Sequence, residues 1–212
     1  VKHCGLNLTK IVLTIIYLLY IIWGKNMRII AGKYRSRKLI TLEGLATRPT
    51  LDQTKEAIFS SLGGYINDFV ILDVFGGSGA LSLESISRGA KEAYIIDSNP
   101  DAVKIIKKNA ENLGVGQELH VYLGDYKKIL ERLNNKKFDI VFLDPPFRMK
   151  VIDELCQYLI ENDMISDGGY IVAEYPKEDI VEQDYEGYRI KMCKRYASSE
   201  ILILEKDDET CE

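Results

Sequence analysis

The sequence has few of the residues that build metal centres and disulfide frameworks. Its 212 residues include four cysteines and two histidines. The cysteines form no Cys-x-x-Cys pair, and neither histidine has a neighbour at metal-ligand spacing; these six residues are Cys4, Cys156, Cys193, Cys211, His3 and His120. We therefore expect no metal and no disulfide framework, and reduced thiols are typical of a cytoplasmic protein.

Internal repeats and segments of simple composition are also absent, which excludes solenoid, collagen-like and disordered chains. Hydrophobic residues make up 46% and charged residues 28% of the chain, as in ordinary globular proteins. A chain of this length suits one domain with a small appendage. The net charge of -4 does not by itself indicate a nucleic-acid partner.

Residues 1–26 differ from the remainder of the chain. The apolar run IVLTIIYLLYIIW (11–23) would reach only about 20 Å as a helix, short of the roughly 30 Å membrane core. The following Gly24-Lys25-Asn26 offers no small-x-small cleavage site. A membrane anchor, an uncleaved signal and a segment translated upstream of the true start remain open. We favour the upstream start, because Met27 opens a polar, basic segment of different character.

From Met27 onward, strand-like and helix-like segments alternate. Near-continuous apolar strands separated by helices predict a mostly parallel sheet covered on both faces. The expected strands are 69–75, 93–96, 119–123, 138–143, 170–174, 188–192 and 200–205, and the expected helices are 51–62, 80–88, 100–113, 126–133 and 151–161. Before them, residues 28–31 and 37–41 predict a small basic β-hairpin. We divide the chain into 1–26, a basic arm (27–50), a catalytic domain (51–206) and an acidic tail (207–212).

Four predicted strands end in polar signatures, at Gly76–Gly79, Asp97, Asp125 and Asp144. Ligands of open α/β sheets bind outside the carboxyl ends of the strands. We therefore expect these residues to meet at one edge of the sheet and to form a ligand site there.

The segment Asp73-Val-Phe-Gly-Gly-Ser-Gly79 predicts a ligand-binding loop between a strand and a helix. Its glycines allow close approach of the backbone to a ligand, and exposed N–H groups at the helix start favour an anionic group. The loop departs from the dinucleotide pattern GxGxxG, because Ser82 stands where the third small residue belongs. A purely structural turn is the alternative. The candidate cofactor-binding residues in this segment are Asp73, Gly76, Gly77, Ser78 and Gly79.

Two further acids extend this candidate site. Asp97 ends a strand about 20 residues beyond the glycine loop, where it could accept both hydroxyls of a ribose. Its alternative is a helix cap, although Asn99 is better placed for that role. Asp125 could accept from an adenine amine or cap the following helix. Together these acids favour an adenosyl ligand, neutral or cationic, over a pyrophosphate.

The tetrapeptide Asp144-Pro145-Pro146-Phe147 carries the strongest chemical signal. Two prolines lack N–H groups and fix a rigid turn, and a residue before proline is held extended. The Asp144 carboxylate and the Pro145 carbonyl can accept the two hydrogens of an exocyclic base amine and direct its lone pair at a methyl donor. Phe147 can stack on the base. The alternative is a rigid turn without catalytic function.

Several motifs in order resemble the bacterial 16S ribosomal RNA guanine-N2 methyltransferases: MRIIAGKYRSRKL, TRPTLDQTKEAIF, DVFGGSGALSLESISRGA and FLDPPF. The resemblance spans residues 27–206. It implies a Rossmann-like class I methyltransferase fold with a seven-stranded sheet, S-adenosylmethionine as the donor held by the glycine loop and Asp97, and a guanine amine at Asp144–Phe147. Three positions depart from the usual pattern: alanine is common where Gly77 or its neighbour stands, Asp97 replaces glutamate, and Ala197 replaces glycine.

The basic arm suggests an RNA substrate. Between positions 28 and 55, seven cations face two acids, a local charge of +5, and such a cluster is a typical phosphate footprint. Tyr34 could stack or contact a sugar. A solvated hairpin is the alternative. The candidate RNA-binding residues are Arg28, Lys33, Tyr34, Arg35, Arg37, Lys38 and Arg48, and Lys55 completes the count of cations.

Three other functions remain open. A DNA adenine or cytosine amino-methyltransferase would use the same tetrapeptide, but it normally needs a target-recognition insertion, for which residues 79–144 leave no room. A catalytically silent RNA-binding assembly factor would not need Asp144, Pro145 and Phe147. A membrane-anchored protein depends on residues 1–26 alone. We expect a cytoplasmic monomer that acts on 16S rRNA or the small ribosomal subunit, with no DNA or membrane partner.

Overall fold

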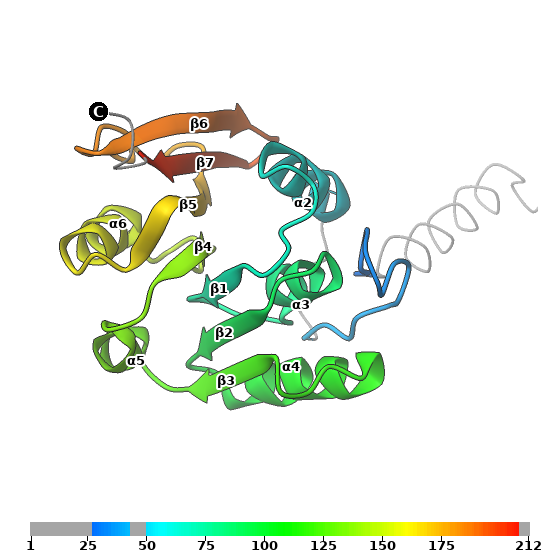
Figure 1. The fold of residues 1–212 in the computed structure, drawn as a ribbon. Coiled ribbons are helices and arrows are strands. Elements are labelled where there is room, and N and C mark those ends of the chain that lie inside the picture. Colours follow the sequence, from blue (N-terminus) through cyan, green and yellow to red (C-terminus); the bar gives the residue numbers. More distant parts are fainter. Residues whose placement is uncertain (1–26, 43–49, 208–212) are drawn as a thin grey trace, which may run out of the picture.

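The computed structural model describes residues 27–42 and 50–207, and its centre is a seven-stranded sheet (Figure 1). The strand order is β3-β2-β1-β4-β5-β7-β6. All strand pairs from β3 to β5 are parallel, and β7 is antiparallel to both of its neighbours. The strands are β1 (Val70–Asp73), β2 (Glu92–Asp97), β3 (Leu119–Leu123), β4 (Phe138–Leu143), β5 (Ile165–Pro176), β6 (Tyr188–Arg195) and β7 (Ser199–Lys206). The predicted α/β class and mostly parallel sheet are confirmed.

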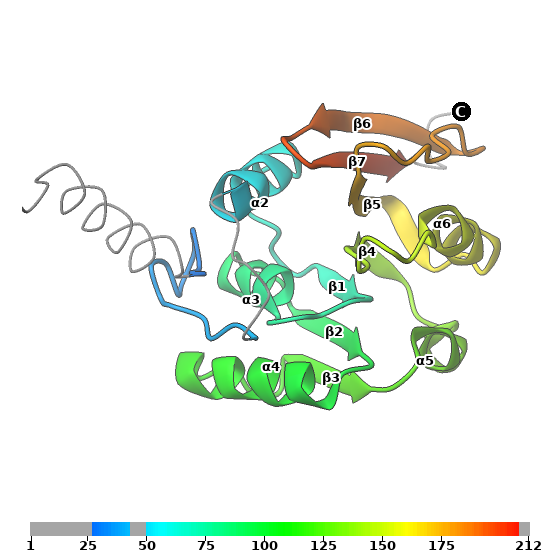
Figure 2. The ribbon, with the colours of Figure 1, turned by 180° about the vertical axis from the view of Figure 1, so that it is seen from behind.

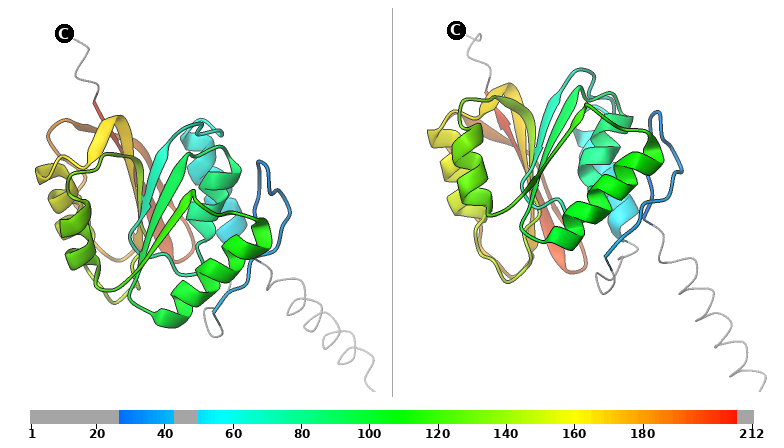
Figure 3. Two further views of the ribbon diagram at one scale, coloured as in Figure 1. Left: turned by 60° about the horizontal axis from the view of Figure 1, so that its bottom comes forward. Right: turned by 90° about the horizontal axis from the view of Figure 1, so that it is seen from below.

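Helices cover both faces of the sheet, and each face has its own apolar core (Figure 3). One face carries α5 (Tyr126–Leu133) and α6 (Ile152–Glu161). The other carries α2 (Thr50–Ser61), α3 (Ala80–Ser87) and α4 (Pro100–Leu113). Buried strands explain why the sequence reads as continuous apolar runs rather than alternating ones.

Helix α4 begins and ends where its sequence predicts. The Asn99 side chain accepts from the backbone N–H of Asp101 at 2.9 Å, and Pro100 occupies the first turn. Gly114 caps the other end with a left-handed φ of 73°, a conformation that glycine adopts without strain. These local signals set where the helix begins and ends.

Strand β5 is longer than predicted, because it begins at Ile165 rather than at residue 170. Its first half contains Gly168, with φ of 66°, and Gly169, where an added Cβ would lie 2.7 Å from the Ser166 carbonyl oxygen. The pairing with β4 is irregular at the same place. Glycines of this kind read as a loop in the sequence, although tertiary pairing holds the segment in the sheet.

The basic arm is a hairpin, as predicted, but its two sides do not form the regular strands expected at residues 28–31 and 37–41. Residues 27–42 lie along the outer side of α3 and α4 (Figure 2). One bridge, between Arg28 and Lys38, joins its two sides in the described part of the arm. Beyond this bridge the Ile29 N–H donates to the Arg37 carbonyl and the Ser36 N–H donates to the Ile29 carbonyl, both at 2.9 Å. The next N–H groups, of Ile30 and Ala31, donate to the Glu84 carboxylate at 2.7 and 3.0 Å.

Within residues 27–42 and 50–207, no helix combines the length and hydropathy needed to cross a bilayer. The apolar run of residues 11–23, Arg48 and residues 208–212 of the acidic tail lie outside the described residues.

Candidate active site

The polar strand ends lie together at the carboxyl edge of the sheet, as the sequence predicts. In the strand register, Leu123 of β3 pairs with Asp97 of β2. Asp73 of β1 pairs with Ile95 of β2 on one side and with Phe142 of β4 on the other. The segments that follow these residues therefore leave the sheet at the same edge. The glycine loop is flanked by Asp97 on one side and by Asp144 on the other.

The glycine loop is a tight turn that only glycine permits at its start. The Gly76 N–H donates to the Ile96 carbonyl at 2.9 Å, and the Gly79 N–H donates to the Gly76 carbonyl at 2.7 Å. A Cβ at Gly76 would lie 2.2 Å from Cγ2 of Ile95. At Gly77, which has φ of 55°, a Cβ would meet nothing nearer than 4.0 Å. The backbone at Gly77 thus borders open space, where a ligand can approach closely.

Asp97 ties the end of β2 to this loop. Its Oδ2 accepts from the Gly77 N–H at 2.8 Å, and its Oδ1 accepts from the Asn99 N–H at 2.7 Å. Each carboxylate oxygen can accept a second hydrogen bond. The half-buried carboxylate beside an open glycine backbone therefore fits the ribose hydroxyls of an adenosyl group.

Asp73 supports the loop from beneath. Its side chain is 2% exposed, and its Oδ2 accepts from the Ser82 hydroxyl at 2.8 Å. Burial raises the pKa of the Asp73 carboxyl to about 6, against the hydrogen bond from Ser82, and the negative charge of Asp97 adds to the rise. Ser82, which breaks the dinucleotide pattern, is thus the residue that holds Asp73, a role the sequence analysis missed.

Two predicted cofactor residues have other partners in the structure. The Ser78 hydroxyl donates to Sδ of Met27 at 3.0 Å, so its side chain faces the basic arm. Asp125 is exposed and caps α5, with Oδ1 accepting from the Lys128 N–H at 3.3 Å. The capping interpretation of Asp125 is confirmed, and its contact with adenine stays a prediction.

Two aromatic rings beside the loop were missed. The rings of Phe75 and Tyr126 lie 5.4 Å apart at a tilt of 57°. Phe75 directly precedes the glycine loop, and Tyr126 directly follows Asp125. Both are half-buried, so they form an apolar wall beside the glycine loop.

The tetrapeptide 144–147 leaves β4 at the same edge. Asp144 and Pro146 are exposed, Pro145 is buried and Phe147 is half-buried. The Met149 N–H donates to the Pro146 carbonyl at 2.7 Å and closes the turn. Pro145 therefore forms the base of the turn, and Asp144 faces solvent beside the glycine loop.

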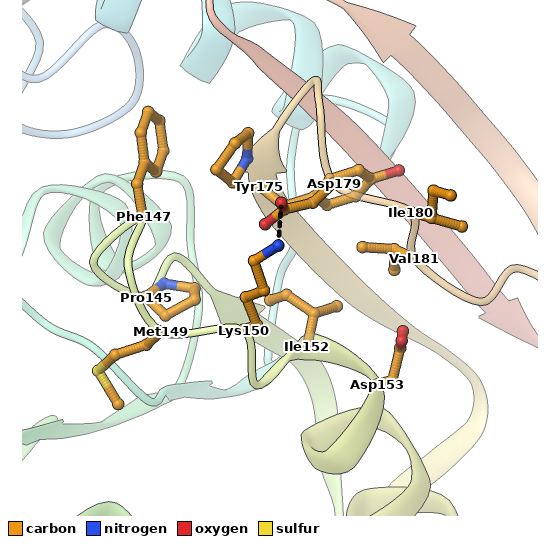
Figure 4. Close-up of a pocket in the computed structure, with 11 residues that line it drawn as sticks. Pro145, Phe147, Met149, Lys150, Ile152, Asp153, Tyr175, Asp179, Ile180 and Val181 are labelled. Carbon is orange, nitrogen blue, oxygen red and sulfur yellow. Dashed lines mark ion pairs between the residues drawn. The ribbon is translucent and has the colours of Figure 1, made fainter.

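A groove begins at this turn and runs towards the loop after β5 (Figure 4). Pro145 and Phe147 line one side, and Tyr175 and Ile180 line the other. The Lys150 ammonium lies 3.1 Å from Oδ1 of Asp179 and bridges the two sides. The groove is aromatic and apolar and begins next to the exposed carboxylate of Asp144. Such a groove suits a flat, polar-edged ring such as a nucleobase.

The exposed cations of the basic arm are Lys33, Arg35, Arg37 and Lys38, together with Arg28, which pairs with Asp52 at 2.9 Å. Two expectations are corrected. Tyr34 is 9% exposed and packs in the core, so its ring is not available for stacking. Lys55 is 2% exposed, and its ammonium lies 3.3 Å from Oε2 of Glu84. A buried, paired ammonium cannot be part of a phosphate footprint.

Glu84 anchors the arm through a buried cluster that the sequence analysis missed. Besides the N–H groups of Ile30 and Ala31, its carboxylate accepts from Lys55 and, at 2.9 Å, from Nε of Arg88. Glu84 is fully buried. A glutamate four residues before an arginine on a helix reads as a surface pair in the sequence; only the fold shows that it is buried.

In the part of the chain that the structure describes, no three His, Cys, Asp or Glu side chains are grouped to hold a metal ion.

The chain is similar to known proteins over most of its length. The family model described as "Conserved hypothetical protein 95" matches residues 27–205. Ribosomal RNA small subunit methyltransferase D of Haemophilus influenzae is 35% identical over 157 residues, covering 72% of this chain and 80% of that protein. The same-named protein of Escherichia coli K12 is 34% identical over 154 residues, covering 73% and 77%.

A solved structure of the Escherichia coli protein yhhF matches with a TM-score of 0.75 and 31% identity, covering 87% of this chain and 99% of that chain. The chain therefore belongs to the conserved hypothetical protein 95 family and is an S-adenosylmethionine-dependent methyltransferase similar to ribosomal RNA small subunit methyltransferase D.

Proposed function

We propose that the protein transfers a methyl group from S-adenosylmethionine to the exocyclic N2 amine of a guanine in 16S ribosomal RNA. The observation that carries this proposal is the position of Asp144, exposed at the end of β4 directly beside the loop that follows β1. A carboxylate and a rigid turn thus lie next to the candidate donor site, with an aromatic groove beyond them.

In this proposal the glycine loop and Asp97 bind the donor, which supplies an electrophilic methyl group. Gly76, Gly77 and Gly79 form the close backbone surface, and Asp73 and Ser78 support it. Asp97 accepts from the ribose hydroxyls, and Asp125 accepts from the adenine amine. Phe75 and Tyr126 flank the adenine ring, and their 5.4 Å contact holds that wall together.

Asp144 and Pro145 orient the guanine. The Asp144 carboxylate and the Pro145 carbonyl accept hydrogen bonds from the two N2 hydrogens, which draws the amine nitrogen towards a tetrahedral geometry and exposes its lone pair. As the N–CH3 bond forms, the S–CH3 bond of the donor breaks, S-adenosylhomocysteine leaves and one N2 proton is lost to solvent. Phe147 stacks on the base, and Pro146 stiffens the turn. The gain in rate comes from positioning and directed hydrogen bonds, and no covalent bond forms between the protein and the base.

The basic arm binds the RNA backbone in this proposal. Its tip lies at the carboxyl-terminal end of α3, because the Lys33 N–H donates to the Ser87 carbonyl at 2.7 Å. An eight-residue helix is about 12 Å long, so Lys33 and Arg35 contact phosphates at some distance from the target base. A folded ribosomal RNA provides such separated contacts. The relatives named small subunit methyltransferase D support the 16S target, and the reaction then belongs to the cytoplasm, with a monomer as the catalyst.

Transfer of labelled methyl from S-adenosylmethionine to small-subunit rRNA, taken from a strain that lacks the gene, tests this function. Nucleoside analysis of the product is expected to give N2-methylguanosine. Label in genomic DNA alone, or N6-methyladenosine in the RNA, would overturn the proposed substrate. The assay with naked 16S rRNA and with assembled small subunits in parallel identifies which form is the substrate.

A further inference from the structure

Asn109 of α4 makes three side-chain hydrogen bonds in a buried position, where it is 1% exposed. Its Oδ1 accepts from the Ile40 N–H at 2.7 Å, and its Nδ2 donates to the Ile40 carbonyl at 2.9 Å. The same Nδ2 donates to the Ser78 carbonyl at 2.9 Å. One carboxamide thus holds the backbone of the basic arm and the backbone of the glycine loop.

The bond to Ser78 fixes one peptide plane of the loop. In the Ser78–Gly79 peptide, the carbonyl accepts from Asn109 and the N–H donates to the Gly76 carbonyl at 2.7 Å. The carbonyl and the N–H of this peptide therefore both have hydrogen-bond partners. Without Asn109 the Ser78 carbonyl would lose its buried partner, and the cost of an unpaired buried group would favour another loop conformation.

Of the side chains on α3 that anchor the arm, Ser87 and Glu84 do not reach the loop, and the Ser78 hydroxyl of the loop itself bonds Sδ of Met27 at 3.0 Å. The Ser87 hydroxyl accepts from the Tyr34 N–H at 2.9 Å and donates to the Ala31 carbonyl at 2.6 Å. Glu84 bonds Ile30 and Ala31. Among these anchors, Asn109 is the side chain that bonds both segments.

We propose that Asn109 is a positioning residue of the methyl-transfer reaction, which sets the donor loop and the RNA-binding arm in their working geometry. This inference rests on the glycine loop as the donor site of the proposed function. It assigns Asn109 no contact with the donor or the base. Its effect on the donor passes through the Ser78–Gly79 peptide, and its effect on RNA passes through Ile40.

The test compares three variants by binding of S-adenosylhomocysteine and of 16S rRNA. Asn109→Ala, which raises helix propensity, is expected to weaken S-adenosylhomocysteine binding about tenfold, as loss of a buried hydrogen-bond partner does, and to weaken RNA binding as well. Ser87→Ala is expected to weaken RNA binding alone. Asn112→Ala, an exposed change on the same helix, is expected to alter neither.

Two further readouts separate positioning from a general loss of stability. The KM for S-adenosylmethionine is expected to rise in Asn109→Ala while kcat changes less than twofold. Hydrogen exchange of the Gly79 amide is expected to accelerate in Asn109→Ala and to stay slow in Ser87→Ala. Asn109→Leu, which keeps the side-chain volume, is expected to repeat both results.

The proposal is overturned if folded Asn109→Ala binds S-adenosylhomocysteine within twofold of the wild type, or if Ser87→Ala weakens that binding equally. Should both Asn109 variants fail to fold, NMR spectra of the wild-type protein test the proposal. The Asn109 carboxamide protons are expected to be protected from exchange and to shift when S-adenosylhomocysteine is added, and unshifted resonances overturn the proposal. Neither result depends on which nucleoside is methylated, so failure of the proposed substrate leaves this test intact.

Discussion

The carboxylate of Asp97 accepts a hydrogen bond from the backbone N–H of Gly77, with 2.8 Å between oxygen and nitrogen. The acid at the end of β2 therefore shapes the loop that follows β1. A single side chain links the candidate ribose contact with the backbone that faces the donor, and this link makes the donor site sensitive to the length and charge of residue 97.

Asp97→Ala is expected to weaken binding of S-adenosylhomocysteine by tenfold to a hundredfold. The change leaves the N–H groups of Gly77 and Asn99 without their acceptor, a loss of about 1–3 kcal/mol, and removes the proposed contact with ribose. Isothermal titration calorimetry measures the change. Asp101→Ala serves as the control, because that side chain is exposed on α4 and pairs with Lys104 at the surface; equal affinities in both variants would contradict the role of Asp97.

Glu84→Gln is expected to destabilise the protein by about 3–5 kcal/mol, since it leaves two buried cations without a charged partner. The pairs are Lys55–Glu84 at 3.3 Å and Arg88–Glu84 at 2.9 Å. By contrast, Arg28→Ala breaks an exposed pair with Asp52 and is expected to cost less than about 1 kcal/mol. Urea unfolding at pH 7 measures both values. Similar small losses in the two variants would mean that the Glu84 cluster does not anchor the fold.

Asp73 is expected to make the protein less stable as the pH rises from about 4 to 7. The folded-state pKa of about 6 lies above the ordinary value of 3.8, so the folded protein binds this proton more tightly than the unfolded chain. The contribution is fully present below about pH 4 and is lost as the pH rises through about 6. This pKa shift corresponds to about 3 kcal/mol of unfolding free energy.

Asp73→Asn keeps a partner for the Ser82 hydroxyl but removes the titration. The difference in unfolding free energy between the wild type and this variant, measured by urea unfolding from pH 4 to pH 7.5, is expected to move in favour of the variant as the pH rises. A difference that stays constant over this range would show that Asp73 titrates normally.

Arg35→Glu is expected to weaken binding of 16S rRNA and to reduce its dependence on salt, because each lost phosphate contact lowers the slope of log K against log salt by about one. Affinity for S-adenosylhomocysteine should not change. Lys128→Glu is the matched control, since Lys128 is exposed on α5, across the sheet from the arm. RNA binding that is insensitive to Arg35 across a salt series would exclude the arm tip as the contact surface.

Local sequence signals were sufficient for most of the catalytic domain. Helices α4 and α5 and strands β3 and β4 begin and end at the predicted residues, because proline, capping residues and glycine mark their ends. The common edge of Gly76, Asp97 and Asp144 also follows from sequence, since parallel strands must present their carboxyl ends together.

The basic arm could not be predicted in the same way. Whether Tyr34 and Lys55 face solvent depends on Glu84 and Ser87, which lie at least 29 residues away along the chain. A basic stretch with a tyrosine looks the same in the sequence whether it is solvated or docked against a helix. The contacts of Asn109 with Ile40 and Ser78 escaped the sequence analysis for the same reason, because no pattern marks which face of α4 is covered by the arm.

The yield of N2-methylguanosine in 16S rRNA, from wild-type protein and Asp144→Asn side by side, tests the central claim most directly. The account predicts N2-methylguanosine from the wild type and a rate about a hundredfold to a thousandfold lower from Asp144→Asn, the loss typical of a missing electrostatic contact in the transition state. S-adenosylhomocysteine should bind both proteins equally. A near-full rate in Asp144→Asn, or a methylated nucleoside other than N2-methylguanosine, would contradict it.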